Sequence, residues 1–283
     1  MAVHEARGNA LIVQAADGYP IATRRYEADG ARARIVVAGA TGVPQGFYRG
    51  FATHAAERGF DVITFDYRGV GDSAPHTLRG FRMDYRDWAR LDLASVLQQA
   101  SGDLPLHLVS HSFGGHALGL LPDPSIVTTM HAYGTGSGWK GWMPRSERLR
   151  VAFLWNVMGP AIVSTQGYLA WKRFSLGEDL PVDVYRQWKR WCRYPGYWFD
   201  DPEIGEEMQG LFARVTVPIT AINAVDDRWS SPAARDAFFS HYTNADLTVR
   251  DLRPAELGQS GIGHMGYFRR SSEPLWDELL DGL

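Results

Sequence analysis

Short apolar runs alternate with amphipathic segments along the first half of the chain. Runs rich in β-branched and aromatic residues are typical of buried strands, whereas apolar positions three and four residues apart indicate helices. The predicted strands are 10–14, 21–26, 34–38, 60–65, 106–110 and 125–131, and the predicted helices are 47–58, 85–99 and 117–121. This alternation predicts a mainly parallel sheet with helices on both faces.

The alternation breaks at Tyr133 and resumes near Val215, with helix-like pieces and little strand signal in between. The later elements predicted are strands at 215–222 and 246–250 and helices from about 232 and at 267–280. No repeat or flexible linker divides the chain. We therefore expect one α/β domain whose core, 1–132 and 215–283, is interrupted after the sixth strand by a helical cap at 133–214.

Ser112 stands at a sharp turn between a predicted strand and a predicted helix. A nucleophilic serine on such a strained bend needs small residues two positions before and after it, because larger side chains would clash. Here these are Ser110 and Gly114. Ser110 is the competing candidate, but the bulky Leu108 lies two positions before it. We therefore expect Ser112 to be the nucleophile.

A serine nucleophile needs a base, and the base needs an orienting carboxylate. His264 lies in a glycine-flanked loop after the last predicted strand, and Asp226 and Asp227 follow the strand that ends near Ala224. Serine, acid, histidine is one of the chain orders known for such triads. His264 is thus the expected base. The acid is one of the two aspartates, because adjacent side chains in a loop cannot both face the same histidine.

An oxyanion formed at the substrate carbonyl needs N–H donors. The backbone N–H of Phe113, directly after the candidate nucleophile, is the first expected donor. The second should come from the loop after the third strand, whose small residues Gly39 to Gly42 allow close approach. Ala40 is the preferred donor in this loop, with Thr41 as the alternative.

A polar turn with two glycines, Gly69 and Gly71, follows the strand 60–65. It lacks the third glycine and the following helix of a dinucleotide-binding fingerprint, so we interpret it as a structural turn. The chain has no phosphate-binding loop, no H-E-x-x-H motif and no set of cysteines for zinc. We expect neither a cofactor nor a metal.

Composition is that of an ordinary globular protein, with 45% hydrophobic and 22% charged residues among 283. The net charge of −3 argues against nucleic acid or an anionic membrane as partner. Cys192 is the only cysteine, which rules out an intrachain disulfide and favours a reducing compartment. The first seven residues lack the apolar core of a signal peptide, and no run approaches the roughly 18 apolar residues of a membrane span. We expect a cytoplasmic protein.

These features together resemble the α/β-hydrolase superfamily, and in particular a bacterial group of predicted α/β-hydrolases described as serine aminopeptidase-like. The matching segments are 40–48, 66–73, 87–92, 110–115, 177–192, 224–227 and 262–266. The resemblance implies the α/β-hydrolase fold and a serine-hydrolase mechanism. It also implies that Asp227, the second of the acidic pair, is the triad acid. It implies no particular substrate.

Seven of the ten tryptophans lie between Trp139 and Trp198, within the expected cap. A small helical cap needs bulky residues for its own core, and we expect most of these tryptophans to serve that purpose. The remainder can line an apolar pocket between cap and sheet. The expected pocket residues are His111, Trp155, Tyr168, Trp188, Trp229 and Met265.

The sequence thus predicts a serine hydrolase that cleaves a small-molecule carboxylic ester through an acyl-enzyme. An amidase or aminopeptidase-like hydrolase and an acyltransferase could use the same triad, and a non-catalytic binding protein on this fold is an alternative of another class. The expected partner is a small molecule that carries an acyl group, and a homodimer is compatible with the sequence.

Overall fold

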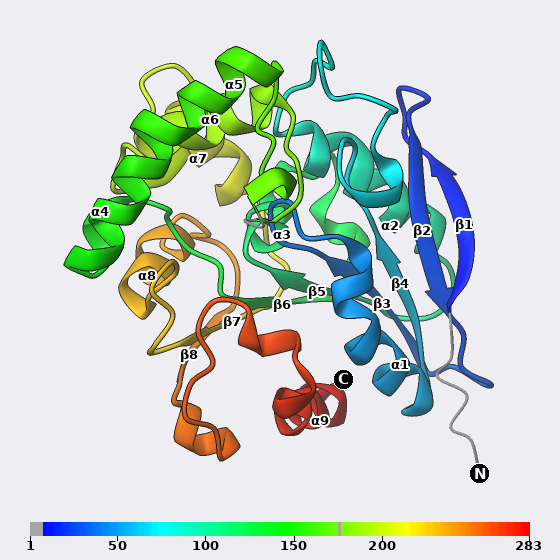
Figure 1. Ribbon diagram of the computed structural model, residues 1–283. Coiled ribbons are helices and arrows are strands. Elements are labelled where there is room, and N and C mark those ends of the chain that lie inside the picture. Colours follow the sequence, from blue (N-terminus) through cyan, green and yellow to red (C-terminus); the bar gives the residue numbers. More distant parts are fainter. Residues whose placement is uncertain (1–7, 175–176) are drawn as a thin grey trace.

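An eight-stranded sheet forms the centre of the computed structural model, which describes residues 8–174 and 177–283 (Figure 1). The N-terminal stretch that lacks a signal-peptide pattern lies outside these ranges. In spatial order the strands are β1 (Asn9–Gln14), β2 (Pro20–Tyr26), β4 (Phe60–Phe65), β3 (Ala33–Ala38), β5 (Leu106–His111), β6 (Thr129–Tyr133), β7 (Ile219–Ala224) and β8 (Leu247–Leu252). β1 and β2 pair antiparallel, β2 pairs antiparallel with β4, and the remaining pairs are parallel.

Helices cover both faces of the sheet, as the alternating pattern predicts. On one face, α1 (Arg49–Glu57) and α9 (Glu273–Gly282) pack side by side on residues such as Val37 and Val109 (Figure 1). On the other face, α2 (Ala94–Ala100), α3 (Phe113–His116) and α8 (Pro232–Phe239) belong to the core cluster that contains Val36 and Leu108. Successive strand residues point to opposite faces, which is why neighbours in one strand enter different clusters.

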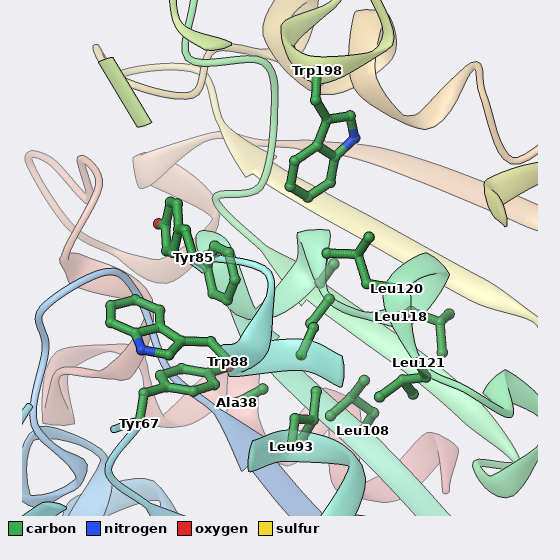
Figure 2. Packing of buried hydrophobic residues seen from close by; sticks show 14 of the residues in the cluster. Ala38, Tyr67, Tyr85, Trp88, Leu93, Leu108, Leu118, Leu120, Leu121 and Trp198 are labelled. Carbon is green, nitrogen blue, oxygen red and sulfur yellow. The ribbon is translucent and has the colours of Figure 1, made fainter. Parts of the chain in front are cut away.

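Four α-helices of the described residues lie between β6 and β7 and gather at one end of the sheet (Figure 1). They are α4 (Arg145–Phe153), α5 (Gly159–Gln166), α6 (Val182–Trp191) and α7 (Gly205–Ala213). Trp198 of this insert belongs to the same hydrophobic cluster as Leu118, Leu120 and Leu121, which follow β5 (Figure 2). Tyr67 and Tyr85 of this cluster both pack against Trp88. The insert therefore shares its hydrophobic core with the sheet.

Several predicted element boundaries are wrong, and local chemistry explains the differences. The strand predicted at 125–131 is Thr129–Tyr133, because Pro124–Ile126 forms a 3-10 turn capped by Asp123, which accepts the Ser125 N–H at 2.9 Å. β7 begins only after Pro218, which has no N–H for the β-ladder. The helix after Ser112 begins at once, at Phe113, and the predicted helix 117–121 is instead a 3-10 turn, Leu118–Leu120.

Candidate active site

Ser112 occupies the bend between β5 and α3 with a backbone φ of 53°. Such a left-handed conformation is costly for any residue except glycine, and it turns the side chain away from the strand. The bend packs tightly: a Cβ at Gly114 would lie 2.1 Å from the carbonyl oxygen of Ala38. The competing serine, Ser110, is fully buried and donates its hydroxyl to the carbonyl of His131 at 3.2 Å.

The side chains of Ser112, His264 and Asp227 form one hydrogen-bonded series. Nε2 of His264 lies 3.1 Å from Oγ of Ser112, and its Nδ1 lies 2.8 Å from Oδ2 of Asp227. The fold thus brings His264 into contact with Ser112, 152 positions before it, and with Asp227, 37 positions before it. In this arrangement the Nδ1 proton is held by the carboxylate and the Nε2 lone pair faces the serine hydroxyl.

Asp227 is buried, and its carboxylate is held from several sides. Oδ1 accepts the backbone N–H groups of Trp229 and Ser230, each at 2.9 Å. Oδ2 accepts the hydroxyl of Tyr267 at 3.2 Å as well as His264. Burial by itself raises the pKa of Asp227, but the charge and hydrogen bond of His264 and the N–H groups of Ser230 and Trp229 outweigh burial and leave the pKa below its ordinary value.

His264 responds in the opposite direction. Burial by itself lowers the pKa of His264, but the charge and the hydrogen bond of Asp227 outweigh burial and raise the pKa above the ordinary 6.5. The adjacent Asp226 has a different task. Its Oδ2 accepts the N–H groups of Ile262 and Gly263, at 2.9 and 3.2 Å, and so holds the loop that carries the histidine. Asp227 thus contacts the side chain of the candidate base, whereas Asp226 holds the backbone of its loop.

The expected oxyanion donors are only partly available. Phe113 begins α3, and its N–H has no hydrogen-bond partner among the described residues. The N–H of Ala40, the preferred second donor, is already engaged, because it donates to the hydroxyl of Tyr48 at 2.8 Å. The N–H of Thr41 has no partner within the described part of the chain, and the Thr41 hydroxyl contacts that of Tyr85.

A cavity of about 350 Å³ opens above Ser112, between the sheet and the insert. Ser112, His264, Phe113, Ala40 and Thr41 all line it. Most of its remaining wall is apolar or glycine, contributed by Gly42, Val43, Tyr85, Gly134, Gly136, Gly138, Leu154, Trp171, Gly177, Tyr197, Trp188, Trp229 and Met265. The polar exceptions are His116, Arg150, Glu178 and Ser230. The site can therefore hold a small, largely apolar molecule against the serine.

Of the six residues predicted to line the pocket, three line the cavity and three do not. Trp188, Trp229 and Met265 line the cavity. His111 does not: it is fully buried behind the site, where Nδ1 lies 3.0 Å from the Tyr48 hydroxyl and Nε2 lies 2.8 Å from the carbonyl oxygen of His264. Trp155 and Tyr168 also lie outside this wall, because Trp155 packs into the insert under Tyr185, at 5.5 Å between ring centroids, and Tyr168 packs against the core.

Within the described residues, no group of three His, Cys, Asp or Glu side chains is arranged to hold a metal ion. The polar turn after β4 has an internal explanation. The carboxylate of Asp66 accepts N–H groups of Gln45 at 2.7 and 3.0 Å and that of Asp72 at 3.0 Å. These contacts support its interpretation as a structural turn.

Comparison with known proteins bears on the fold. A sequence model of the family described as alpha/beta hydrolase fold matches residues 35–121. A monoglyceride lipase from Saccharomyces cerevisiae superposes with a TM-score of 0.70 at 13% identity, covering 100% of this chain and 96% of that chain. The protein therefore has the α/β-hydrolase fold.

An esterase from Exiguobacterium antarcticum superposes with a TM-score of 0.62 at 18% identity, covering 97% of this chain and 99% of that one. An enzyme described as degrading N-acyl homoserine lactones gives 0.63 at 20% identity, with coverage of 96% and 100%. No curated protein matches the sequence significantly. These matches confirm the expected α/β-hydrolase fold and support the resemblance to the superfamily, whereas membership of the bacterial aminopeptidase-like group stays a prediction.

Two residues of the candidate site gave no signal in the sequence. Tyr267 donates to Asp227, yet a tyrosine three residues after a candidate base has no recognised pattern. Tyr197 lines the cavity with a φ of 59° and is, with Ser112, one of two non-glycine residues in the described ranges with positive φ.

No described helix is both long and apolar enough to cross a membrane.

Proposed function

We propose that the protein is a serine hydrolase that cleaves carboxylic esters of small molecules through an acyl-enzyme. The observation that carries the proposal is the series from Asp227 through His264 to Ser112, with contacts of 2.8 and 3.1 Å, at the floor of an apolar cavity. A serine becomes an effective nucleophile only when such a base can take its proton. The fold alone would not support this conclusion, because α/β-hydrolase folds host many chemistries.

In the proposed reaction, Oγ of Ser112 attacks the ester carbonyl while Nε2 of His264 takes the hydroxyl proton. Asp227 keeps the proton on Nδ1 and stabilises the imidazolium that forms. His264 then gives its proton to the leaving alcohol. Water, activated by the same nitrogen, attacks the acyl group on Ser112 and releases the carboxylic acid.

The negative charge that develops on the carbonyl oxygen needs donors already in place. Phe113 and Thr41 take this role in the proposal, because both line the cavity and neither N–H has a partner within the described ranges. Ala40 is replaced in this role because its N–H is engaged by Tyr48.

An aminopeptidase-like hydrolase would need an acidic side chain in the insert to receive a free amino terminus. Glu178 lines the cavity, but its carboxylate already pairs with Lys172 at 2.6 Å. A paired carboxylate attracts a second cation less strongly, which supports the ester over the aminoacyl substrate. Comparing turnover of matched esters and aminoacyl amides separates the two.

The decisive test is reaction with a fluorophosphonate probe followed by mapping of the modified residue by mass spectrometry. We expect labelling at Ser112 that is lost in Ser112→Ala and His264→Ala, and ester hydrolysis that is lost in the same variants. Wild-type turnover in folded Ser112→Ala would overturn the proposal. Absence of labelling in the folded wild-type protein would favour a non-catalytic binding protein instead.

A further inference from the structure

His111 and Tyr48 lie directly behind the candidate triad. His111 is the last residue of β5 and precedes Ser112, and Tyr48 ends the 3-10 turn Gln45–Tyr48. Both side chains are buried, and neither lines the cavity. They therefore act on any substrate only through other residues.

Their hydrogen bonds can be assigned in one direction only. The carbonyl oxygen of His264 can only accept, so the proton of His111 lies on Nε2 and is donated to that oxygen at 2.8 Å. Nδ1 of His111 then offers a lone pair, which accepts the hydroxyl of Tyr48 at 3.0 Å. The Tyr48 oxygen in turn accepts the N–H of Ala40 at 2.8 Å.

The protonation states required for this series follow from burial. Burial and the charge of His264 lower the pKa of His111 to about 3, so its ring stays neutral. Burial raises the pKa of Tyr48, so its hydroxyl keeps the proton that it donates. Across the pH range in which a histidine base works, the donor and the acceptor in each of these hydrogen bonds therefore stay the same.

The series joins two loops that approach the nucleophile from different sides. One end fixes the backbone at Ala40, in the loop that carries the candidate donor Thr41. The other end fixes the carbonyl of His264, whereas Asp226 holds the N–H groups just before it. The base is thereby held on both sides of its own backbone, in a loop where Gly263 has a φ of 57°.

Packing alone does not require these polar atoms. The ring of His111 lies among Phe47, Tyr267 and Phe268, at 6.4, 6.0 and 5.4 Å between ring centroids. An apolar side chain could pack against the same three rings. We propose that His111 and Tyr48 are positioning residues for the hydrolysis proposed above, and that the donation from His111 to the His264 carbonyl keeps the base aligned with Ser112. The inference rests on that proposed function.

A pair of variants of equal shape isolates the donated hydrogen bond. Gln and Met have nearly the same size, but only Gln can donate to the His264 carbonyl. For His111→Met we expect kcat to fall roughly tenfold with KM within about twofold, because a misplaced base impairs the transition state and not binding. His111→Gln should recover most of that loss. The rate of fluorophosphonate labelling at Ser112 should follow the same order.

Coupling between the two residues gives a second measurement. If they act as one series, the fold-loss in the double variant Tyr48→Phe with His111→Met is smaller than the product of the two single losses. Tyr67→Phe is the matched control, because Tyr67 is also buried, but its hydroxyl has no hydrogen-bond partner among the described residues and Tyr67 does not line the cavity. Equal losses in His111→Met and His111→Gln, or a purely multiplicative double variant, would overturn the inference.

A readout without turnover separates this inference from the proposed function. Hydrogen exchange of the segment 261–266, followed by mass spectrometry, should be faster in His111→Met than in His111→Gln. If the wild-type protein neither hydrolyses esters nor reacts with the probe, the proposed function fails, whereas the exchange result still tests the tie between His111 and the loop. Equal exchange in both variants would refute the tie itself.

Discussion

The carboxylate of Asp227 lies 2.8 Å from Nδ1 of His264, whereas that of the adjacent Asp226 accepts backbone N–H groups of the loop that carries this histidine. Two neighbouring aspartates thus have separable tasks. The contact with Nδ1 decides which tautomer His264 adopts, and that tautomer decides whether Nε2 can take a proton from Ser112.

Replacing Asp227 by Asn should lower kcat for ester hydrolysis by about 10³- to 10⁴-fold, because the amide no longer holds the required tautomer. Asp226→Asn is the matched control. It keeps one carbonyl oxygen for the N–H groups of Ile262 and Gly263, so a loss of tenfold or less is expected. Steady-state kinetics of both folded variants checks this, and equal losses would contradict the assignment of the acid.

The pH profile should carry the signature of the coupled pair. His264 is active when neutral, and its pKa is raised above the ordinary 6.5. The acid limb of kcat/KM should therefore have its midpoint above pH 6.5, with activity lost as the pH falls through it. In Asp227→Asn the charge that raises the pKa is absent, so the limb of the residual activity should move to lower pH. A limb that stays in place would contradict this coupling.

Backbone contact at the bend predicts a strong effect of one added methyl group. Gly114→Ala would place a Cβ 2.1 Å from the Ala38 carbonyl oxygen, and relief of that clash must displace β3 or the bend. We expect a loss of about 1–3 kcal/mol in the free energy of unfolding, measured with urea, together with loss of probe labelling. Gly46→Ala is the control, because an added Cβ there would have no described atom within 4 Å apart from its own residue and its chain neighbours. It should change the free energy of unfolding by less than about 0.5 kcal/mol.

Tyr267 provides a further test of the support for Asp227. Its hydroxyl donates to Asp227 at 3.2 Å and accepts the Ala224 N–H at 2.8 Å. Tyr267→Phe leaves both groups short of a partner in a buried place, so the free energy of unfolding should fall by about 1–3 kcal/mol. Tyr67→Phe removes a buried hydroxyl that has no hydrogen-bond partner in the described part of the chain, and it should be neutral or stabilising. Urea unfolding of the two variants gives the comparison, and equal stabilities would contradict it.

Local requirements made Ser112 and His264 recognisable in the sequence. A serine on a sharp bend needs small residues two positions away on either side, and the histidine of such a triad follows the last strand. Both requirements concern residues close together along the chain or the order of elements. The mainly parallel sheet was recognisable for the same reason, because apolar periodicity and the alternation of strands and helices are local patterns. Its exact boundaries depend on caps and prolines such as Asp123 and Pro218.

Contacts between distant segments decided the rest. The sequence alone left Asp226 and Asp227 open, favoured Ala40 as an oxyanion donor and put His111 in the pocket. The resemblance favoured Asp227 over Asp226. The hydroxyl of Tyr48 engages both the N–H of Ala40 and the ring of His111, although Tyr48 is 8 residues from Ala40 and 63 from His111 along the chain. A hydrogen bond depends on the position and direction of single atoms to within a few tenths of an ångström, and only the packed chain determines these. A sequence pattern specifies residue types at intervals, so it can indicate a nucleophile and its base but not which N–H remains free beside them.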